Sequence, residues 1–197
     1  MQYTKLENEY VKLKPLELND AEGIFAVGTD EKIWRYMSVQ LHSKADVQQY
    51  VNKALKQKEN GAEYPFVIID VKTNNIIGST RFLDISLQHK RLEIGSTWIT
   101  PCYWRTAINT NCKYLLLEYC FETIGMNRVQ IKTDHENIRS QKAIERLGAV
   151  KEGILRNHMI RRDGTIRHTV MYSITKEEWA IMKEQFRKWD KQHRLIY

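Results

Sequence analysis

Three β-rich segments follow one another in the middle of the chain, and they constrain the fold more than any other feature. They cover Tyr64 to Val71, Ile76 to Asp84 and Leu92 to Ile99, and they are rich in the β-branched and aromatic residues that strands favour. Residues 72–75 contain two asparagines and are typical of a hairpin turn. Gly95 interrupts the third segment, where a glycine often marks a β-bulge. The sequence therefore predicts three neighbouring antiparallel strands.

The segment before this run predicts one strand and two helices. Tyr10 to Leu16 alternates apolar and polar residues, as a half-buried strand does. Asn19 has Glu22 three residues later, and Ser43 has Asp46 at the same spacing. In a capping box each of the two side chains accepts a hydrogen bond from the other residue's backbone N–H, so both pairs predict a helix start.

After Pro101 helices and strands alternate. Thr110 to Ile124 is apolar almost all round, as expected of a helix packed against a sheet, and Gly125 ends it. The elements predicted next are a strand over Arg128 to Thr133, a helix over Ser140 to Leu147 capped by Asn137 and closed by Gly148, and strands over Gly153 to Ile160 and Thr165 to Ser173. The dipeptide Asp163-Gly164 between the last two strands is a strong hairpin signal.

A final helix is predicted from the capping box of Thr175 and Glu178. Its apolar residues share one face at helical spacing. They are Trp179, Met182, Phe186 and Trp189. Such a stripe typically packs against the core or against a second subunit, so a homodimer stays open.

The order of elements predicts the α+β class, a mixed sheet with helices on its faces. With 197 residues, 42% of them apolar, the chain is long enough for one core, and we expect a single domain over residues 1–197. Apolar runs such as Tyr114 to Leu117 are far shorter than the roughly 20 residues that span a bilayer. The start of the chain has no apolar signal-peptide segment. We therefore expect a cytoplasmic protein with no membrane partner.

The cysteines and histidines do not predict a metal site. Cys102, Cys112 and Cys120 are odd in number, and their spacing matches no metal or redox motif, so they are interpreted as ordinary thiols. The histidines show no ligand spacing either, and we expect each to be a surface or sheet residue. The three considered are His135, His158 and His168.

The net charge of +7 raises the question of a nucleic-acid partner. The positive charges are spread along the chain, and the densest clusters, Arg161-Arg162 and Arg187 to Arg194, are short or interrupted by acids. A solvated face is therefore the favoured interpretation of these clusters, and nucleic-acid binding is not expected. A basic protein also attracts an anionic ligand such as a nucleotide cofactor, and charge alone does not choose between these partners.

Several short motifs in the second half of the chain occur together at fixed spacing. They are Asn137-Ile138-Arg139-Ser140-Gln141-Lys142-Ala143, Leu147-Gly148-Ala149, Glu152-Gly153-Ile154-Leu155-Arg156 and the hairpin dipeptide Asp163-Gly164. Together with the element order, they make the chain resemble the GNAT acetyltransferases over nearly its whole length. The resemblance is greatest to the subgroup similar to the ribosomal-protein N-terminal (RimJ/RimL-like) acetyltransferases.

The resemblance implies both a fold and an activity. The fold is the GNAT-like acyl-CoA N-acyltransferase fold, a predominantly antiparallel central sheet with helices on both faces. The activity is direct transfer of an acetyl group from acetyl-CoA, a co-substrate, to a primary amine, without a metal. The implied partners are acetyl-CoA and an amine acceptor, which is either a protein N-terminus or a small-molecule amine.

In such enzymes a loop before a helix binds the cofactor pyrophosphate, because helix N-termini offer unpaired N–H groups to a polyanion. The family loop reads Gln/Arg-x-x-Gly-x-Gly/Ala, whereas this chain has Trp104 to Asn109 and departs at all three marked positions. Ala107 in place of glycine adds a Cβ, which fits if its φ is negative. The loop residues expected to contact the cofactor are Arg105, Thr106, Ala107, Ile108, Asn109 and Thr110. An ordinary strand-to-helix turn is the alternative.

Further cofactor contacts are implied elsewhere. The family's splayed strands let the pantetheine insert like an extra strand, so the backbone of Trp98, Ile99 and Thr100 is expected to contact it. Asn137 is expected both to cap its helix and to contact the cofactor. Lys142 is expected to approach the cofactor's charged end.

Two residues are predicted to take part in proton transfer. Glu93, on the strand that leads to the cofactor loop, is positioned to accept the ammonium proton directly or through water. Ser140 stands where the resembling subgroup carries a serine near the cofactor sulfur, so its hydroxyl is expected to protonate the departing thiolate. The alternatives are an exposed Glu93, or one paired with Arg91, and a Ser140 that belongs simply to the first turn of its helix.

Strand alternation adds a prediction about the surroundings of Glu93. It sends Leu92, Ile94 and Trp98 to one face of the sheet and Glu93 to the other.

The sequence leaves two matters open. A non-enzymatic GNAT-like domain that binds acyl-CoA or regulates is the alternative to an enzyme, and a nucleic-acid binder is the third reading. The acceptor-facing segments of this architecture include Trp34 to Met37 and Asn157 to Arg162, and neither dictates which amine is used.

Overall fold

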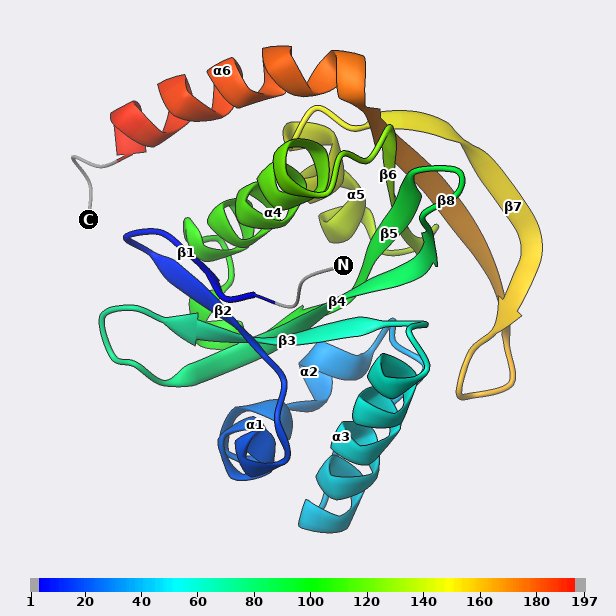
Figure 1. The fold of residues 1–197 in the computed structure, drawn as a ribbon. Helices are drawn as coiled ribbons and strands as arrows, with labels where there is room; N and C mark the ends of the chain where they lie inside the picture. Colours follow the sequence, from blue (N-terminus) through cyan, green and yellow to red (C-terminus); the bar gives the residue numbers. More distant parts are fainter. Residues whose placement is uncertain (1–3, 194–197) are drawn as a thin grey trace.

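Eight strands form one sheet in the order β1-β2-β3-β4-β5-β6-β8-β7 in the computed structural model, which describes residues 4–193 (Figure 1). The strands are β1 (Leu6–Glu7), β2 (Val11–Pro15), β3 (Tyr64–Asp70), β4 (Ile76–Ser86), β5 (Arg91–Ile99), β6 (Arg128–Asp134), β7 (Val150–Ile160) and β8 (Ile166–Thr175). Among the described strands, β5 and β6 run parallel and the other neighbouring pairs are antiparallel. The predicted class, a predominantly antiparallel sheet in an α+β protein, is confirmed.

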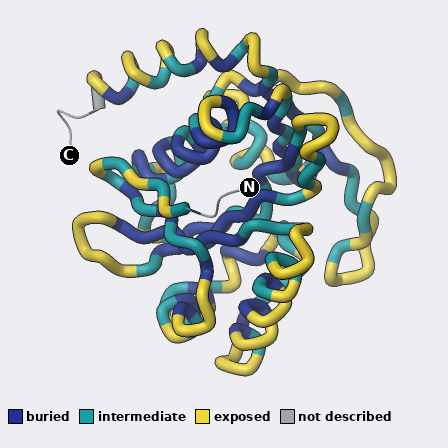
Figure 2. Tube along the Cα trace, viewed as in Figure 1, coloured by how far each residue is buried: buried dark blue, intermediate teal, exposed yellow. Residues whose placement is uncertain are grey.

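Helices cover both faces of this sheet, as predicted. They are α1 (Ala21–Gly28), α2 (Glu31–Trp34), α3 (Lys44–Glu59), α4 (Ile108–Glu118), α5 (Ile138–Arg146) and α6 (Lys176–His193). One buried cluster joins α1, α2 and α3 to the sheet, and a second, larger cluster lies under α4, α5 and α6. Figure 2 shows α4 and the central strands as the most buried part of the chain, while the tip of the β7–β8 hairpin is exposed.

The parallel strands β5 and β6 separate along their length. They pair only over Arg91 to Glu93 on β5 and Arg128 to Gln130 on β6. Beyond these residues the two strands are not paired with each other, although β5 continues to Ile99 and β6 to Asp134. We call the space between these diverging ends the wedge. Its edges carry backbone groups that a strand-like ligand can pair with.

A β-bulge in β5 is confirmed next to Gly95. Gly95 pairs with Arg81 and Trp98 pairs with Ser79, so three steps on β5 match two on β4. Ser96 takes a left-handed conformation there, with φ of 48°. The extra residue reverses the alternation of side chains beyond it.

The bulge overturns one sequence-based prediction. Leu92 and Ile94 belong to the cluster under α4, whereas Trp98 belongs to the cluster under α1 to α3. Trp98 therefore does not share a face with the other two. Its indole N–H donates to the Tyr50 hydroxyl at 3.1 Å, and its ring lies 5.3 Å from that of Trp34.

Two predicted helix boundaries are also corrected. The first helical segment opens with a 3₁₀ turn over Leu18–Asp20, and its capping box joins Glu17 to Asp20 rather than Asn19 to Glu22. The Asp20 carboxylate accepts from the N–H of Glu17 at 2.8 Å, so the helical segment is capped at Glu17, before the predicted cap at Asn19. The capping box predicted for Ser43 and Asp46 is present at the start of α3. At the start of α6, the Glu178 carboxylate accepts from the Thr175 N–H at 2.7 Å.

The long helix predicted over Thr110 to Ile124 begins earlier and changes character near its end. It starts at Ile108, and Tyr119–Thr123 forms a π-helical turn. The apolar stripe of α6 packs on this helix: the ring of Phe186 stacks on Tyr114 at 3.7 Å, and Trp179 and Met182 are buried. The core interpretation of the stripe is therefore confirmed for Trp179 and Met182.

Within residues 4–193, no helix combines the length and apolar character needed to cross a membrane. Cys112 and Cys120 are buried and Cys102 is exposed. Burial raises the pKa of the Cys112 thiol to about 11.

Candidate functional site

Two helices begin where the wedge opens. α4 follows β5 and α5 follows β6, so both helix starts lie at the carboxyl ends of the same parallel pair. The Arg139 guanidinium of α5 lies 3.6 Å from the ring centroid of Trp104, in the loop before α4. This cation–π contact holds the two helix starts side by side. We call Trp104, Arg105, Arg139 and the first turn of α4 the helix-start cluster.

The loop before α4 presents backbone donors. Ala107 is the N-cap with φ of −66°, so the negative φ that its Cβ requires is present. Its methyl group cannot cap a helix, and the nearest hydroxyl, that of Thr106, accepts from the Ile108 N–H at 3.4 Å while donating to Tyr103. The N–H groups of Asn109 and Thr110, which have no partner within residues 4–193, are therefore available to an anion, as at other anion-binding helix starts.

Arg105 is held in the left-handed conformation, with φ of 64°. A residue with a Cβ pays about 1–2 kcal/mol there, and such strain gathers at ligand-binding loops. Burial, together with the nearby charge of Arg105, lowers the pKa of Arg139. Within residues 4–193 neither arginine forms an ion pair with a carboxylate. The helix-start cluster thus concentrates positive charge that an anionic ligand can neutralise.

Of the three β5-side residues predicted to contact the cofactor, Ile99 is the one whose backbone N–H faces the wedge. The Thr100 N–H donates to the Ile77 carbonyl on the β4 side at 2.8 Å. Since neighbouring residues of a strand point their backbone groups to opposite sides, the Ile99 N–H points toward the wedge. The Ile99 carbonyl accepts from the Trp104 indole at 2.7 Å. Trp98, whose side chain packs on the other face, points its carbonyl toward Gly78.

Glu93 lies at the closed end of the wedge and is 1% exposed. Both sequence alternatives for it, an exposed position and a pair with Arg91, are wrong, because Arg91 pairs with Asp84. Lys132 of β6 lies 2.9 Å from Glu93 Oε2. The other oxygen, Oε1, lies over Gly95, where an added Cβ would come within 2.7 Å of it. Gly95 thus leaves room for the carboxylate beside the bulge.

Lys113 is a buried cation behind the same bulge. Its Nζ donates to the Thr97 hydroxyl at 2.7 Å, and Thr97 in turn lies 2.7 Å from the Thr80 hydroxyl. Burial lowers the pKa of Lys113 from 10.5 to about 8, against smaller opposing effects of Cys112 and Glu93. A lysine poised this close to neutrality, beside a candidate site, is unusual for a structural position.

The start of α5 has the predicted cap. Asn137 Oδ1 accepts from the Ser140 N–H at 3.1 Å. The Ser140 side chain is half-buried, and its hydroxyl has no hydrogen-bond partner within residues 4–193. Lys142 is exposed on the same helix. The Ser140 hydroxyl is therefore available to a ligand in the wedge.

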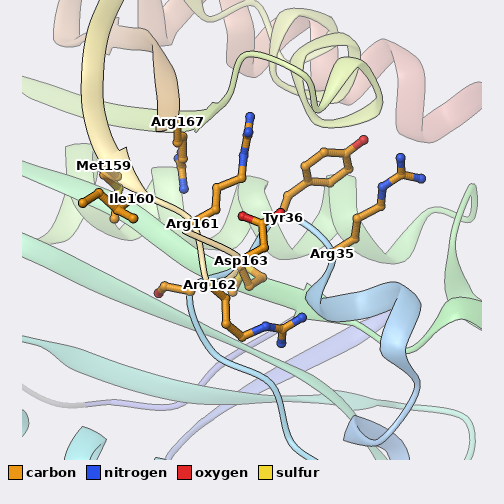
Figure 3. A pocket seen from close by; sticks show the side chains of 10 residues that line it. Arg35, Tyr36, Met159, Ile160, Arg161, Arg162, Asp163 and Arg167 are labelled. Carbon is orange, nitrogen blue, oxygen red and sulfur yellow. The ribbon is translucent and has the colours of Figure 1, made fainter. Parts of the chain in front are cut away.

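A pocket of about 450 Å³, including its open mouth, lies between the two segments expected to face the acceptor. Figure 3 shows Arg35 and Tyr36, from the segment after α2, opposite the β7–β8 hairpin. We call this the arginine pocket. Its lining residues are Arg35, Tyr36, Met37, Ser38, Met159, Ile160, Arg161, Arg162, Asp163 and Arg167.

Asp134 anchors the inner wall of the arginine pocket. Its two carboxylate oxygens accept from Arg161 at 2.8 and 2.9 Å, a bidentate pair. Burial alone would raise the pKa of Asp134, but the Arg161 hydrogen bonds outweigh it and hold that pKa below its ordinary value. With 16% of its side chain exposed, Arg161 is not the solvated residue that the sequence favoured.

Four residues near the site were missed by the sequence reasoning: Lys113, Lys132, Arg139 and Arg167. Arg139 lies inside the Asn137 to Ser140 motif, so its charge beside a predicted anion site was a usable signal. Lys113 interrupts an otherwise apolar helix and was a signal of the same kind. Lys132 and Arg167 come close to the site because strands far apart in the sequence pair in the sheet. Their neighbours along the chain therefore gave no signal of this position.

Within residues 4–193, no group of three or more His, Cys, Asp and Glu side chains is arranged to hold a metal ion. His135 and His168 face each other with ring centroids 4.7 Å apart, and His158 Nδ1 lies 3.1 Å from the Thr169 hydroxyl.

Comparison with known proteins points to one family. Residues 11–150 match the model of the acetyltransferase (GNAT) domain. YoaA, an uncharacterised N-acetyltransferase of Bacillus subtilis, is 29% identical over 176 residues, which cover 87% of this chain and 96% of that protein. YdaF of the same organism, whose name assigns it provisionally to ribosomal N-acetylation, is 24% identical over 90% of this chain and 97% of its own.

Comparison with solved structures identifies similar proteins of the same kind. A GCN5-related N-acetyltransferase from Brucella melitensis superposes with a TM-score of 0.90 at 26% identity, covering 96% of this chain and 86% of that one. The similarity therefore extends over nearly the whole chain, in both sequence and structure.

Proposed function

Because the chain belongs to the GNAT acetyltransferase family, we propose that it transfers the acetyl group of acetyl-CoA directly to a primary amine. The observation that carries this proposal is the wedge between β5 and β6, with two basic helix starts at its open end. It combines a slot for an extended pantetheine with an anion site for its pyrophosphate.

The helix-start cluster is the proposed pyrophosphate site. The first-turn N–H groups of α4 and the charges of Arg105 and Arg139 face a common region, which a polyanion would neutralise. The Ile99 N–H is the proposed backbone contact of the pantetheine in the wedge. Asn137 and the exposed Lys142 complete the proposed contacts on α5.

The proposed chemistry needs a free amine, a positioned carbonyl and a protonated leaving thiol. The amine nitrogen bonds to the acetyl carbon, and the bond from that carbon to sulfur breaks. Glu93 receives the proton that the amine loses, through Oε1, since Lys132 engages Oε2. Ser140 gives its hydroxyl proton to the sulfur and regains one from water.

The acceptor is proposed to enter from the arginine pocket, on the side of Glu93 away from α4. A protein N-terminus and a small-molecule amine both remain within the proposal. The name of YdaF, a relative at 24% identity, favours inclusion of ribosomal-protein N-termini among the amines to be tested.

The test is an acceptor screen that measures released CoA thiol, with the acetylated product identified by mass spectrometry. Thiol release that depends on both the protein and an amine is the expected result. Calorimetry with acetyl-CoA runs in parallel. If acetyl-CoA binds but neither peptide N-termini nor small amines release thiol, the protein is an acyl-CoA-binding module and the proposed transfer is wrong.

A further inference from the structure

We propose that the arginine pocket binds a carboxylate or phosphate group carried by the amine acceptor, so that the substrates are amines with a second, anionic end. This inference rests on the proposed transfer to an amine and adds the class of acceptor. It follows from the charge that lines the pocket, from one buried arginine without a full set of partners, and from the position of the pocket beside Glu93.

The lining of the pocket is unbalanced in charge. Four arginines line it against a single carboxylate, that of Asp163. Asp163 is already engaged by Thr165, whose hydroxyl and N–H donate to it at 2.6 and 3.0 Å. Within residues 4–193, Arg35 and Arg162 form no ion pair with any carboxylate. The pocket therefore holds positive charge that its own residues do not neutralise.

Arg167 is the arginine of this pocket with an unsatisfied buried donor. Its side chain is 13% exposed, and its Nε is buried with no hydrogen-bond partner within residues 4–193. The nearest carboxylate oxygen, Asp134 Oδ2, lies 3.9 Å away and already accepts from Arg161 at 2.8 Å. A buried donor left unpaired destabilises the protein, and more so when it is charged. Arg167 also lines the pocket, so an anionic oxygen bound there beside its guanidinium would offset this incomplete pairing.

The fixed arrangement of the other charges suits recognition by geometry. Asp134 holds Arg161 in a bidentate pair, and Glu136 lies 3.2 Å from the same guanidinium. Arg161 also donates to the Ile166 carbonyl at 3.2 Å, so its plane is fixed against the hairpin. Arg167 lies beside this ordered group (Figure 3) and points its guanidinium toward the pocket. A planar guanidinium held in place is the group that proteins use to bind carboxylate and phosphate.

The pocket is close enough to the reacting groups to orient an acceptor. Arg167 lies 3.9 Å from Asp134 at the end of β6. Lys132, two residues earlier and therefore on the same face of β6, lies 2.9 Å from Glu93. An acceptor whose anionic end binds Arg167 would therefore extend its amine toward the Glu93 carboxylate. Binding energy at the remote end would then position the amine for attack.

The test uses pairs of amines that differ only in the anionic group. One arm compares β-alanine, 4-aminobutyrate and 5-aminovalerate with their amides, and the other compares phosphoethanolamine with ethanolamine. We expect the anionic member of at least one pair to have a kcat/KM about tenfold or more above its neutral partner. The arm with the larger preference identifies carboxylate or phosphate as the group bound.

Arg167→Met should reduce this preference to near one, mainly by raising the KM of the anionic amines. Arg167→Lys, which keeps the charge but loses the planar fork, should retain part of it. The matched control is Arg187→Met on α6, an exposed arginine paired with Glu184, and it should keep the full preference. Circular dichroism checks that all three variants are folded.

Two outcomes overturn the inference and are distinguishable from a failure of the proposed transfer. If neutral amines are acetylated as well as anionic ones at every length, the pocket does not select an anion, although the transfer stands. If no amine releases thiol, calorimetry of glutarate and of inorganic phosphate with wild type and Arg167→Met decides. Binding lost in the variant supports the pocket, and no binding to either protein overturns it.

Discussion

The helix-start cluster and the arginine pocket are both basic, but they hold their positive charge in different ways. In the helix-start cluster, Arg105 and Arg139 have no carboxylate partner within residues 4–193, and backbone N–H groups supply the remaining donors. In the arginine pocket, Asp134 and Glu136 fix Arg161, and Arg167 is left with an unpaired Nε. Backbone donors dominate the first region, and an ordered network of side chains dominates the second.

This difference suggests two kinds of recognition. Backbone donors and unpaired charges accept any polyanion of suitable shape, as a cofactor common to many enzymes requires. An arginine fixed by a carboxylate presents its donors in one direction, so it selects by geometry. Substitutions in the helix-start cluster should therefore change the affinity for acetyl-CoA, and substitutions in the arginine pocket should change the kcat/KM of the acceptor.

The largest effect should come from reversing a charge in the helix-start cluster. Arg105→Glu replaces a cation next to the proposed pyrophosphate with an anion. Hydrogen bonds to charged groups contribute about 1.5–3 kcal/mol, and repulsion adds to their loss, so the affinity for acetyl-CoA should fall about a hundredfold. Calorimetry measures it. Arg162→Glu, the same charge change in the arginine pocket, should leave this affinity nearly unchanged, and an equal loss would show that the two regions are not separate.

Ala107→Val tests backbone approach in the same cluster without a charge change. Ala107 is buried at the N-cap with a negative φ that valine also adopts, so the helix start should persist. The larger side chain should hinder close approach of phosphate to the backbone and weaken acetyl-CoA binding about tenfold. Unchanged affinity in well-folded Ala107→Val and Arg105→Glu would contradict the placement of the pyrophosphate.

Ser140→Ala should lower kcat about ten- to a hundredfold, because the departing thiolate loses its proton donor. Acetyl-CoA affinity and the acceptor KM should change little, since the Asn137 cap uses the Ser140 N–H and not its hydroxyl. Steady-state kinetics with the best acceptor from the screen measures this. A variant that keeps full kcat would leave Ser140 as a residue of the first helical turn.

Glu93→Gln should have a smaller effect that depends on pH. A primary amine is mostly protonated at neutral pH, so a base must remove a proton before or during attack. We expect kcat/KM to fall about tenfold at neutral pH and to recover as pH rises, because free amine then comes from solution. Glu93→Gln also removes the ion pair with Lys132, so Lys132→Met serves as a control that removes this pair and keeps the carboxylate. A uniform loss at every pH in Glu93→Gln would mean that the carboxylate supports structure instead.

Local signals in the sequence were enough to predict most of the fold. Capping at Ser43 and Asn137 and the hairpin at Asp163-Gly164 each depend on a few neighbouring residues, and the structure contains them. The bulge beside Gly95 was predicted, but its effect on Trp98 was not, because one inserted residue reverses the alternation of all that follow. The Glu17 and Asp20 box was missed because Asn19 offered an equally good local pattern.

Of the two parts of the candidate site, one could be predicted from local sequence and the other could not. The helix-start cluster lies within two short stretches, so the sequence placed Arg105 at an expected anion site and Asn137 at an expected cofactor contact. The arginine pocket draws on the segment after α2, on Asp134 of β6 and on the β7–β8 hairpin. Its charges become a site only when the fold brings Arg35, Asp134 and Arg167 together, and no pattern along the chain indicates that arrangement.

The smallest expected effect concerns Lys113, a buried cation that has no network like that of Arg161 to fix it. The pKa of Lys113 is about 8 in the folded protein against 10.5 when it is unperturbed. Between these values the unfolded chain binds more protons than the folded one, so stability should rise with pH, by about 1 kcal/mol from pH 8 to pH 9. Below pH 8 the buried ammonium lowers the free energy of unfolding by its full amount, and above pH 10.5 this destabilisation is gone. Urea unfolding of wild type and Lys113→Met measures this as a difference. Most of the opposing titration of Cys112 cancels in it, because burial is the main cause of the Cys112 shift in both proteins. Lys53→Met, which removes an exposed lysine on α3, should give no such slope. A flat difference for Lys113 as well would mean that its ammonium is stabilised in the fold, and the contrast with the acid-paired Arg161 would then fail.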